Sequence, residues 1–248
     1  MVIPLGSAWA FALLLFRASG LVLTAPILSA RVAPQKVRIA LAVLVTWAAW
    51  SGAGMPSAPP PTRMGPLVAA AALETAFGVL AGLASRFVLE AALSAGAVAG
   101  QAVGIGFASS IDPASGANSN AVSELVFTMA QAGAVALGIH REAIAWLARS
   151  AVAFPPGGSF ALRPAALRVV WEATGAAALG ARVAFPMLAA VLVGQVAMAG
   201  LNRSAPQLSL GAIGFSIAVL AGGGAFYLVA PGAAEVVARA AVGAIGVR

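Results

Sequence analysis

Eight apolar stretches divide this chain, and they constrain its fold more than any other feature. They cover roughly residues 8–28, 37–51, 66–84, 87–111, 122–139, 143–154, 175–201 and 209–230. A helix that crosses a bilayer needs about 20 apolar residues, and several of these stretches reach that length. Hydrophobic residues make up 61% of the chain and charged residues 8%, against about 25% charged residues in soluble domains. The chain therefore folds where lipid or other hydrophobic subunits replace water.

The pattern inside these stretches favours helices over strands. Alanine and leucine recur at helical spacing, and no stretch sustains the alternation of period two that a half-buried strand shows. Proline, glycine and serine mark irregular connections at 51–66 and 154–164, and residues 109–121 are the most polar part of the chain. We therefore predict an all-α fold of integral membrane-type helical hairpins.

Ionisable residues interrupt several of the apolar stretches. Arg17, Glu74, Glu90 and Arg182 all lie within them. Charges are costly in hydrocarbon and usually face protein or water. Because 37–51 and 143–154 are also short, simple up-and-down insertion into the membrane is doubtful.

The net charge of +7 does not indicate nucleic-acid binding. The 14 basic residues are scattered singly, apart from a cluster at Arg31, Lys36 and Arg38. Nucleic-acid binders group their Lys and Arg side chains along the phosphate backbone. Contact between a loop and anionic lipid headgroups explains the excess charge more simply.

The sequence offers no constellation for catalysis. It has no cysteine and a single histidine, His140, so it provides neither a thiolate nucleophile nor a cysteine metal site. No phosphate-binding loop, metal-ligand spacing or nucleophile motif is present. We expect no enzymatic activity, no cofactor and no metal ion.

Glycine spacing predicts close helix packing in the fourth stretch. Gly96, Gly100 and Gly104 recur every four residues, which is the small-xxx-small spacing that lets helix backbones approach each other. The neighbouring helix belongs either to this chain or to another subunit.

Residues 104–120 read GIGFASSIDPASGANSN and allow two interpretations. An Asp-Pro pair and Gly116 favour turns, which fits an external loop. Irregular backbone at membrane depth survives only inside protein or beside a water-filled path. The second interpretation is therefore a re-entrant element, or plug, that lines a channel.

Four blocks of sequence resemble the FliR family of type III export gate subunits. They are FRASGLVLTAPILSARVAPQKVRIALAV (16–43), LETAFGVLAGL (73–83), AGQAVGIGFASSIDPASG (99–116) and FPMLAAVLVGQVAMAGLNRSAPQLSLGAIGFS (185–216). Each block alone is weak evidence. Together they cover most of the chain in the order that the family has.

The resemblance implies a core subunit of the flagellar type III export gate, through which unfolded flagellar proteins pass. One copy of this chain would assemble with FliP and FliQ and contact an FlhB-like cytoplasmic partner and membrane lipid. Residues 1–172 would pack like a FliP subunit, and residues 173–248 would form a FliQ-like helical hairpin. The location implied is the bacterial inner membrane, in the flagellar basal body.

The resemblance also implies two sets of site residues. A plug loop over about 107–119 would include Gly106, Phe107, Ile111, Asp112, Pro113, Ser115 and Gly116. Contacts between subunits, or at headgroup level, would involve Arg17, Arg38, Glu74, Arg182, Arg203, Pro206 and Gln207. The segment NRSAPQ (202–207) would join the helices of the C-terminal hairpin, either as a recognition tip or as a solvated turn.

Two alternatives stay open from the sequence. The first is an injectisome subunit of the related SctT family. The second belongs to another class, a secondary transporter with Glu74 or Arg182 as its coupling group. Transporters often contain internal repeats, and the two halves of this chain show no convincing repeat.

Overall fold

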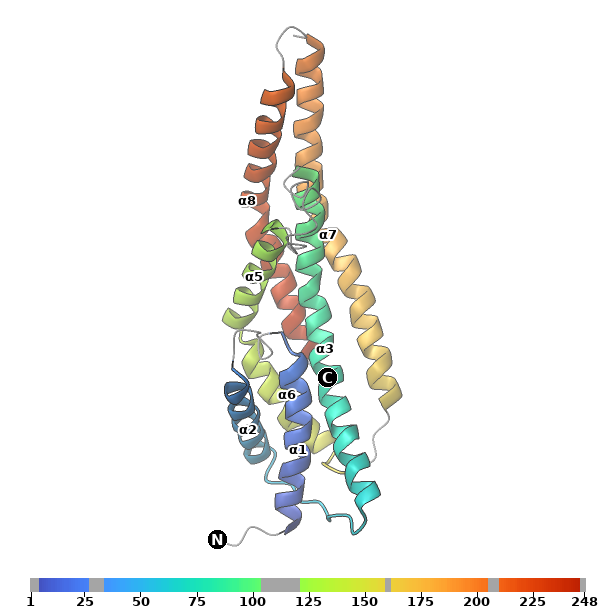
Figure 1. Cartoon of the computed structure of the whole chain (residues 1–248). Helices are drawn as coiled ribbons and strands as arrows, with labels where there is room; N and C mark the ends of the chain where they lie inside the picture. The colour runs from blue at the N-terminus through green and yellow to red at the C-terminus, as the bar shows by residue number, and fades with distance from the viewer. Residues whose placement is uncertain (1–4, 27–33, 104–120, 159–161, 205–209, 246–248) are drawn as a thin grey trace. The chain divides into compact units, whose positions relative to one another are not determined.

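The computed structural model describes residues 5–26, 34–103, 121–158, 162–204 and 210–245, and all regular elements within these ranges are α-helices (Figure 1). This confirms the all-α prediction. The helices are α1 (Leu5–Thr24), α2 (Gln35–Gly52), α3 (Met64–Val103), α5 (Ala121–Ala136), α6 (Ile139–Ala153), α7 (Leu162–Ser204) and α8 (Leu210–Ile245).

Helix α3 joins two apolar stretches that the sequence analysis separated at Ser85 and Arg86. It runs for 40 residues without a break. The buried Ser85 hydroxyl donates a hydrogen bond to the carbonyl of Gly82 one turn earlier, and the Arg86 side chain lies on the exposed side. Both polar residues therefore fit into a continuous helix.

Four helices in the described part of the chain are long and apolar enough to cross a membrane. They lie at Leu5–Thr24, Met64–Ala102, Leu162–Ala197 and Tyr227–Ile245, and α5 with α6 adds a fifth if this bent pair counts as one span. A rise of 1.5 Å per residue makes α3 about 60 Å long. That length is about twice the thickness of the hydrocarbon layer.

The chain divides into two compact units. Unit 1 comprises residues 1–87, 134–174 and 240–248, and it holds α1, α2, α6 and the beginning of α3 and α7. Unit 2 comprises residues 88–133 and 175–239, and it holds the rest of α3 and α7 with most of α5 and α8. Whether residues 1–172 and 173–248 correspond to FliP-like and FliQ-like parts stays a prediction.

Glycines let α1 and α3 approach closely in unit 1. A Cβ atom added at Gly78 would lie 1.9 Å from the Arg17 carbonyl oxygen, and one added at Gly20 would lie 2.3 Å from the Thr75 carbonyl oxygen. At Gly82, one turn beyond Gly78, the added atom would lie 2.0 Å from the Thr24 hydroxyl oxygen. No larger side chain fits between these backbones, so this crossing depends on glycine.

Helices α1, α2 and α6 pack against one another in the same unit (Figure 1). Three rings hold α1 to α2: Phe11 stands edge-on to both Trp47 and Trp50, with ring centroids 6.2 and 5.7 Å away. Such edge-to-face pairs add to the burial of the rings themselves. The break between α5 and α6 falls at Gly138, which has a φ of 86°, a conformation that glycine adopts without strain.

Small residues also bring the helices of unit 2 together. A Cβ atom added at Gly96 of α3 would lie 2.6 Å from the Cα atom of Ser123 in α5. One added at Gly180 of α7 would lie 3.1 Å from the carbonyl oxygen of Ala91 in α3. The small residue predicted at Gly96 to contact a neighbouring helix therefore contacts a helix of its own chain.

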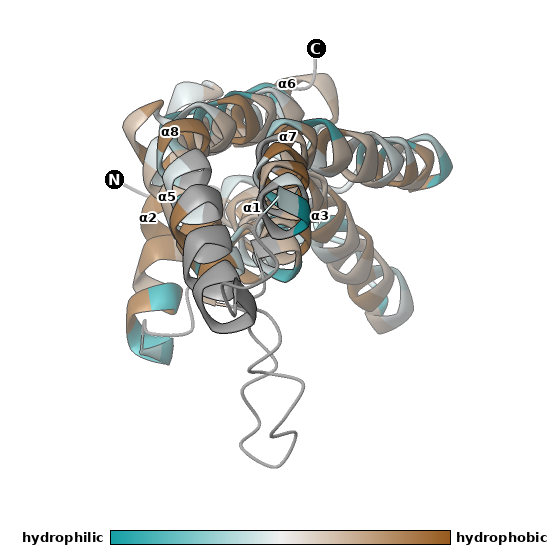
Figure 2. Cartoon of the chain, turned by 90° about the horizontal axis from the view of Figure 1, so that it is seen from above, coloured by the Kyte–Doolittle hydropathy of each residue, from teal (hydrophilic) through white to brown (hydrophobic). Residues whose placement is uncertain are grey.

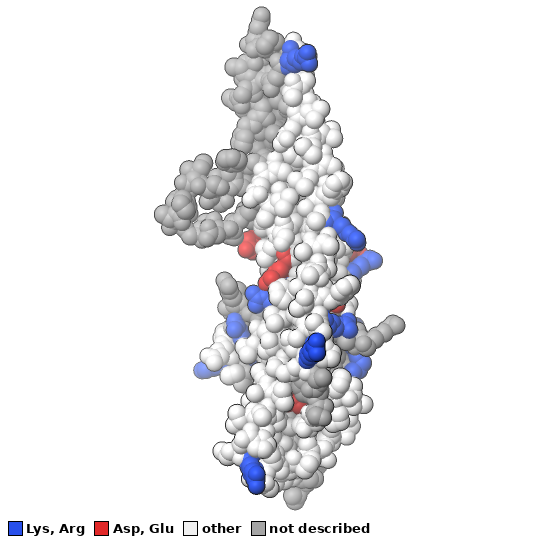
Figure 3. All heavy atoms as spheres, turned by 90° about the vertical axis from the view of Figure 1, so that its right-hand side faces the viewer, with Lys and Arg blue, Asp and Glu red and all other residues white. Residues whose placement is uncertain are grey.

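Large apolar side chains cover much of the outer surface. In α2, Val37, Ile39, Leu44 and Trp47 are each more than half exposed, and Figure 2 shows apolar colour over part of this helix. Charged atoms form small separate groups on a largely uncharged face in Figure 3. Such a surface requires lipid or other apolar partners.

Gly78→Ala should destabilise the protein, because its new Cβ atom would overlap the backbone of α1. Overpacking a core costs about 1–3 kcal/mol. We expect the free energy of unfolding in detergent to fall by an amount near the top of this range. Gly65→Ala in the same helix is the control, since nothing lies within 4 Å of its added Cβ atom. Equal thermal unfolding of the two variants would contradict a glycine-dependent crossing.

Candidate functional site

Arg17 of α1 and Glu74 of α3 form a buried ion pair in unit 1. The Arg17 Nε atom donates a hydrogen bond of 2.6 Å to Glu74 Oε2. The two side chains are 0% and 1% exposed, so the pair has no contact with solvent or lipid. It lies at the glycine-lined crossing, because the Gly78 backbone packs against the Arg17 carbonyl.

The remaining polar atoms of the pair bond to α6 and to the segment that follows it. Arg17 Nη1 donates to the Ser150 hydroxyl at 2.9 Å, and Nη2 donates to the Phe154 carbonyl at 3.0 Å. The backbone N–H of Gly157 donates to Glu74 Oε1 at 2.9 Å. The network therefore connects α1, α3, α6 and the 154–158 connection.

Each charge in this network is compensated. The carboxylate accepts two hydrogen bonds, and the guanidinium donates three. The guanidinium carbon also lies 5.1 Å from the centre of the Phe77 ring, close enough for a cation–π interaction. A buried pair is stable only when its other polar atoms are also bonded, and this one meets that condition. The network is an internal structural connection.

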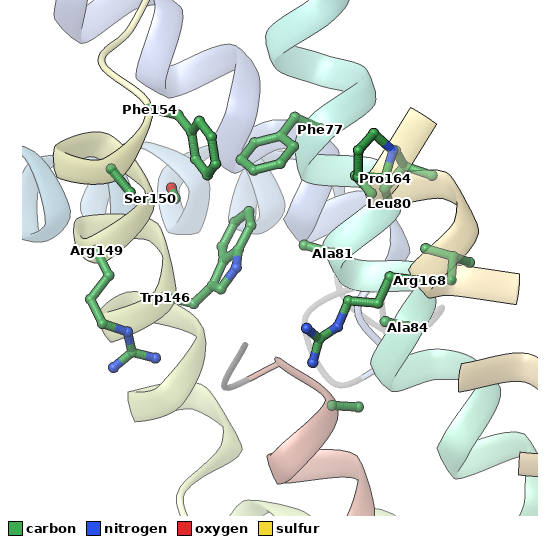
Figure 4. Close-up of a pocket in the computed structure, with 14 residues that line it drawn as sticks. Phe77, Leu80, Ala81, Ala84, Trp146, Arg149, Ser150, Phe154, Pro164 and Arg168 are labelled. Carbon is green, nitrogen blue, oxygen red and sulfur yellow. The ribbon is translucent and has the colours of Figure 1, made fainter. Parts of the chain in front are cut away.

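A pocket of about 740 Å³ lies next to the network in unit 1. Phe77, Ser150 and Phe154, which all contact Arg17, form part of its wall. Figure 4 shows the rings of Phe77 and Phe154 together, with Trp146 below them. The guanidinium groups of Arg149 and Arg168 lie farther from the two phenyl rings and on opposite sides of the view. Pocket volumes of 300–1,000 Å³ are typical of small-molecule sites.

The lining residues carry no nucleophile paired with a general base. Ser150 bonds to Arg17 and to the Leu147 carbonyl, and no histidine lines the pocket. Among the described residues, no three metal-ligating side chains come together. The geometry supports binding and structural roles.

Comparison with known protein families assigns the chain to one of them. Residues 8–242 match the family described as "Bacterial export proteins, family 1", which is nearly the whole chain. The chain belongs to this family.

Curated relatives agree with this assignment and confirm the FliR resemblance. The flagellar biosynthetic protein FliR of Escherichia coli (strain K12) is 29% identical over 208 residues, which is 84% of this chain and 79% of the relative. FliR of Pectobacterium carotovorum subsp. carotovorum is 28% identical over 83% of this chain and 78% of the relative. FliR of Caulobacter vibrioides (strain ATCC 19089 / CIP 103742 / CB 15) is 24% identical over 85% and 84%.

The structure differs from the prediction for Arg17 and Glu74. The prediction for both is a contact between subunits or at headgroup level. They instead bond to each other inside the chain, and their side chains are buried. The reason is that α1 and α3 cross at their glycines, which brings the two charges together from opposite helices.

The other predicted contact residues have varied positions. Arg182 and Arg203 are exposed in α7 of unit 2, and Arg38 is half-buried in α2 of unit 1. Pro206 and Gln207 lie outside the described residues, as does the whole predicted plug from Gly106 to Ser119. Their predicted roles therefore stay predictions.

Sequence reasoning missed the residues that complete the network and the pocket. Ser150, Phe154 and Gly157 are separated from Arg17 by more than 130 residues and carry no motif. The sequence signal for this network is the presence of Arg17 and Glu74 in separate apolar stretches, because charged side chains there need partners. That signal leads to Arg17 and Glu74 but not to the backbone groups around them.

Glu74→Ala should strongly destabilise the chain, because it leaves the buried Arg17 guanidinium without its counter-charge. Removing one partner of a buried pair costs about 3–5 kcal/mol, so we expect a large fall in melting temperature. Glu142→Ala breaks a partly exposed pair with Arg149 and should cost at most about 1 kcal/mol. The double variant Arg17→Met with Glu74→Leu should recover part of the loss. Similar melting temperatures for Glu74→Ala and Glu142→Ala would contradict the assigned role.

Proposed function

We propose that this chain is a core subunit of the export gate itself, which forms with FliP and FliQ the channel for unfolded flagellar proteins. The chain is a subunit of the flagellar type III export apparatus. The observation that carries the proposal is the family match over residues 8–242, supported by FliR relatives that each cover more than four-fifths of this chain.

The chain is membrane-embedded, and we assign it to the bacterial inner membrane within the flagellar basal body. Its candidate spans are distributed over α1, α3, α7 and α8. Helices α3 and α7, of 40 and 43 residues, are much longer than a bilayer needs. Such lengths fit helices that continue beyond the bilayer and pack against other subunits.

The exposed apolar residues of unit 2 support an assembly with FliP and FliQ. In α7, Phe185, Val193 and Val196 are each at least 70% exposed, and in α8, Tyr227 and Leu228 are 79% exposed. Exposed patches of this kind mark protein or membrane contacts. Arg182 and Arg203 are exposed on the same α7 and offer charged groups to neighbouring subunits or to the FlhB-like partner.

The chain acts in this proposal as a structural channel component and not as an enzyme. The pocket residues provide no acid–base or nucleophilic pair. Exported polypeptides pass through the channel. The energy for export comes from other components. The plug assigned to about 107–119 rests on the polar, turn-rich sequence of this segment and on the family resemblance.

A secondary transporter is less well supported. Its coupling group would have to change partners during transport, yet Glu74 is buried and already accepts bonds from Arg17 and Gly157. The relatives found are flagellar FliR proteins, which favours the flagellar over the injectisome version.

Co-expression with FliP and FliQ tests the assembly. Native mass spectrometry of the tagged chain should show a mixed complex that contains one copy of this chain. Expression without the two partners is the control, and it should give a poorly soluble or heterogeneous protein. A stable homo-oligomer that excludes both partners would overturn the proposal.

Arg203→Ala tests the contact assigned to the end of α7. Arg203 is exposed in the last turn of that helix, so the variant should fold normally and yet lower swimming motility in cells that lack the original gene. Arg239→Ala is the matched control, because Arg239 is exposed in the same unit and pairs with Glu235 on its own helix. Full motility of Arg203→Ala would remove this residue from the contact set.

A further inference from the structure

The pocket in unit 1 has an amphipathic lining. Its interior wall is apolar and aromatic, formed by Phe77, Leu80, Trp146 and Phe154 with several alanines. Two guanidinium groups, from Arg149 and Arg168, lie on the side away from Phe77 and Phe154 (Figure 4). A ligand that fits this lining has an apolar body and an anionic end.

The two arginines differ in the hydrogen bonds that their guanidinium groups make within the chain. Arg149 donates a hydrogen bond to Glu142 on the same helix. Arg168 lies 3.9 Å from Glu172, beyond hydrogen-bond distance, and donates no hydrogen bond within the described part of the chain. A guanidinium carries five N–H donors in a planar fork that matches a phosphate or carboxylate. Of the two guanidinium groups, that of Arg168 therefore has more N–H donors available to an anion.

Both arginines lie near an end of their helices. Arg149 lies in the last two turns of α6 (Ile139–Ala153), and Arg168 lies in the second turn of α7. The non-helical residues 154–158 follow α6, and irregular backbone is not found in contact with lipid tails. Arginines near helix ends reach the headgroup layer while their stems stay among apolar groups.

We propose that this pocket binds one anionic phospholipid. An acyl chain lies against Phe77, Leu80 and Trp146, and the phosphodiester bonds to Arg168. The charges decide between lipid classes, because a zwitterionic headgroup brings its own cation to the two guanidinium groups. The bound lipid also covers the wall that Phe77 and Phe154 form around Arg17.

The test uses the chain purified in detergent with its co-expressed partners and titrated with lipid under native mass spectrometry. Phosphatidylglycerol and phosphatidylcholine with identical acyl chains are compared. We expect wild type to retain one tightly held phosphatidylglycerol in preference to phosphatidylcholine. Inorganic phosphate at the same concentration should not displace it, because phosphate lacks the acyl chain.

Three variants locate the site. Arg168→Gln should weaken phosphatidylglycerol binding about tenfold or more, the effect of losing one charged hydrogen bond. Arg163→Gln should bind as wild type does, because Arg163 is exposed on the same helix but does not line the pocket. Ala81→Leu should weaken binding by filling the pocket while leaving both arginines in place. Melting temperatures confirm that each variant is folded.

Several results would overturn the proposal. Equal binding by Arg168→Gln and wild type, or equal retention of the two lipids, would exclude an anion site at Arg168. Retention by the free chain but not by the assembled complex would show that a partner subunit fills the pocket instead. The inference rests on the proposed membrane location but not on assembly with FliP and FliQ. Because the spectra also count subunits, failure of that assembly is recorded separately from failure of lipid binding.

Discussion

The buried ion pair between Arg17 and Glu74 is the interaction on which unit 1 depends. Two charges in a medium without water are costly, and their attraction offsets that cost only when the remaining donors and acceptors are also bonded. Here those bonds come from Ser150, Phe154 and Gly157. The pair therefore requires α6 and the following segment to be in place, and it links segments far apart in the chain.

Glycine makes this pair possible. Between helices in lipid the hydrophobic effect gives little driving force, so close packing and polar bonds must hold helices together. Gly20, Gly78 and Gly82 allow backbone contacts between α1 and α3 that any side chain would prevent. At that separation Arg17 and Glu74 meet directly at 2.6 Å. The small residues and the charges are thus two parts of one helix crossing.

The sequence predicts the helical class and the membrane environment because both follow from composition and periodicity, which are local properties. It also marks Arg17 and Glu74 as charges that need partners. It does not predict that they bond to each other, since the crossing of α1 and α3 depends on spatial contacts between distant glycines. The continuous helix at Ser85 and Arg86 was missed for a similar reason. Two adjacent polar residues resemble a break between helices in the sequence, and only the structure shows that Ser85 is buried and Arg86 is exposed within one helix.

The distribution of polarity in unit 1 explains why a lipid site can form there. The fully charged groups Arg17 and Glu74 lie inside, whereas large apolar residues such as Leu44 and Trp47 lie outside. Phe77 and Phe154 lie between the two environments. The Phe77 ring lies against the guanidinium, the Phe154 backbone carbonyl accepts a hydrogen bond from it, and both residues line the pocket. An acyl chain against these residues would lie next to a pair that the chain itself already shields from water. The pocket and the ion pair therefore meet at the Phe77 ring and at the Phe154 backbone.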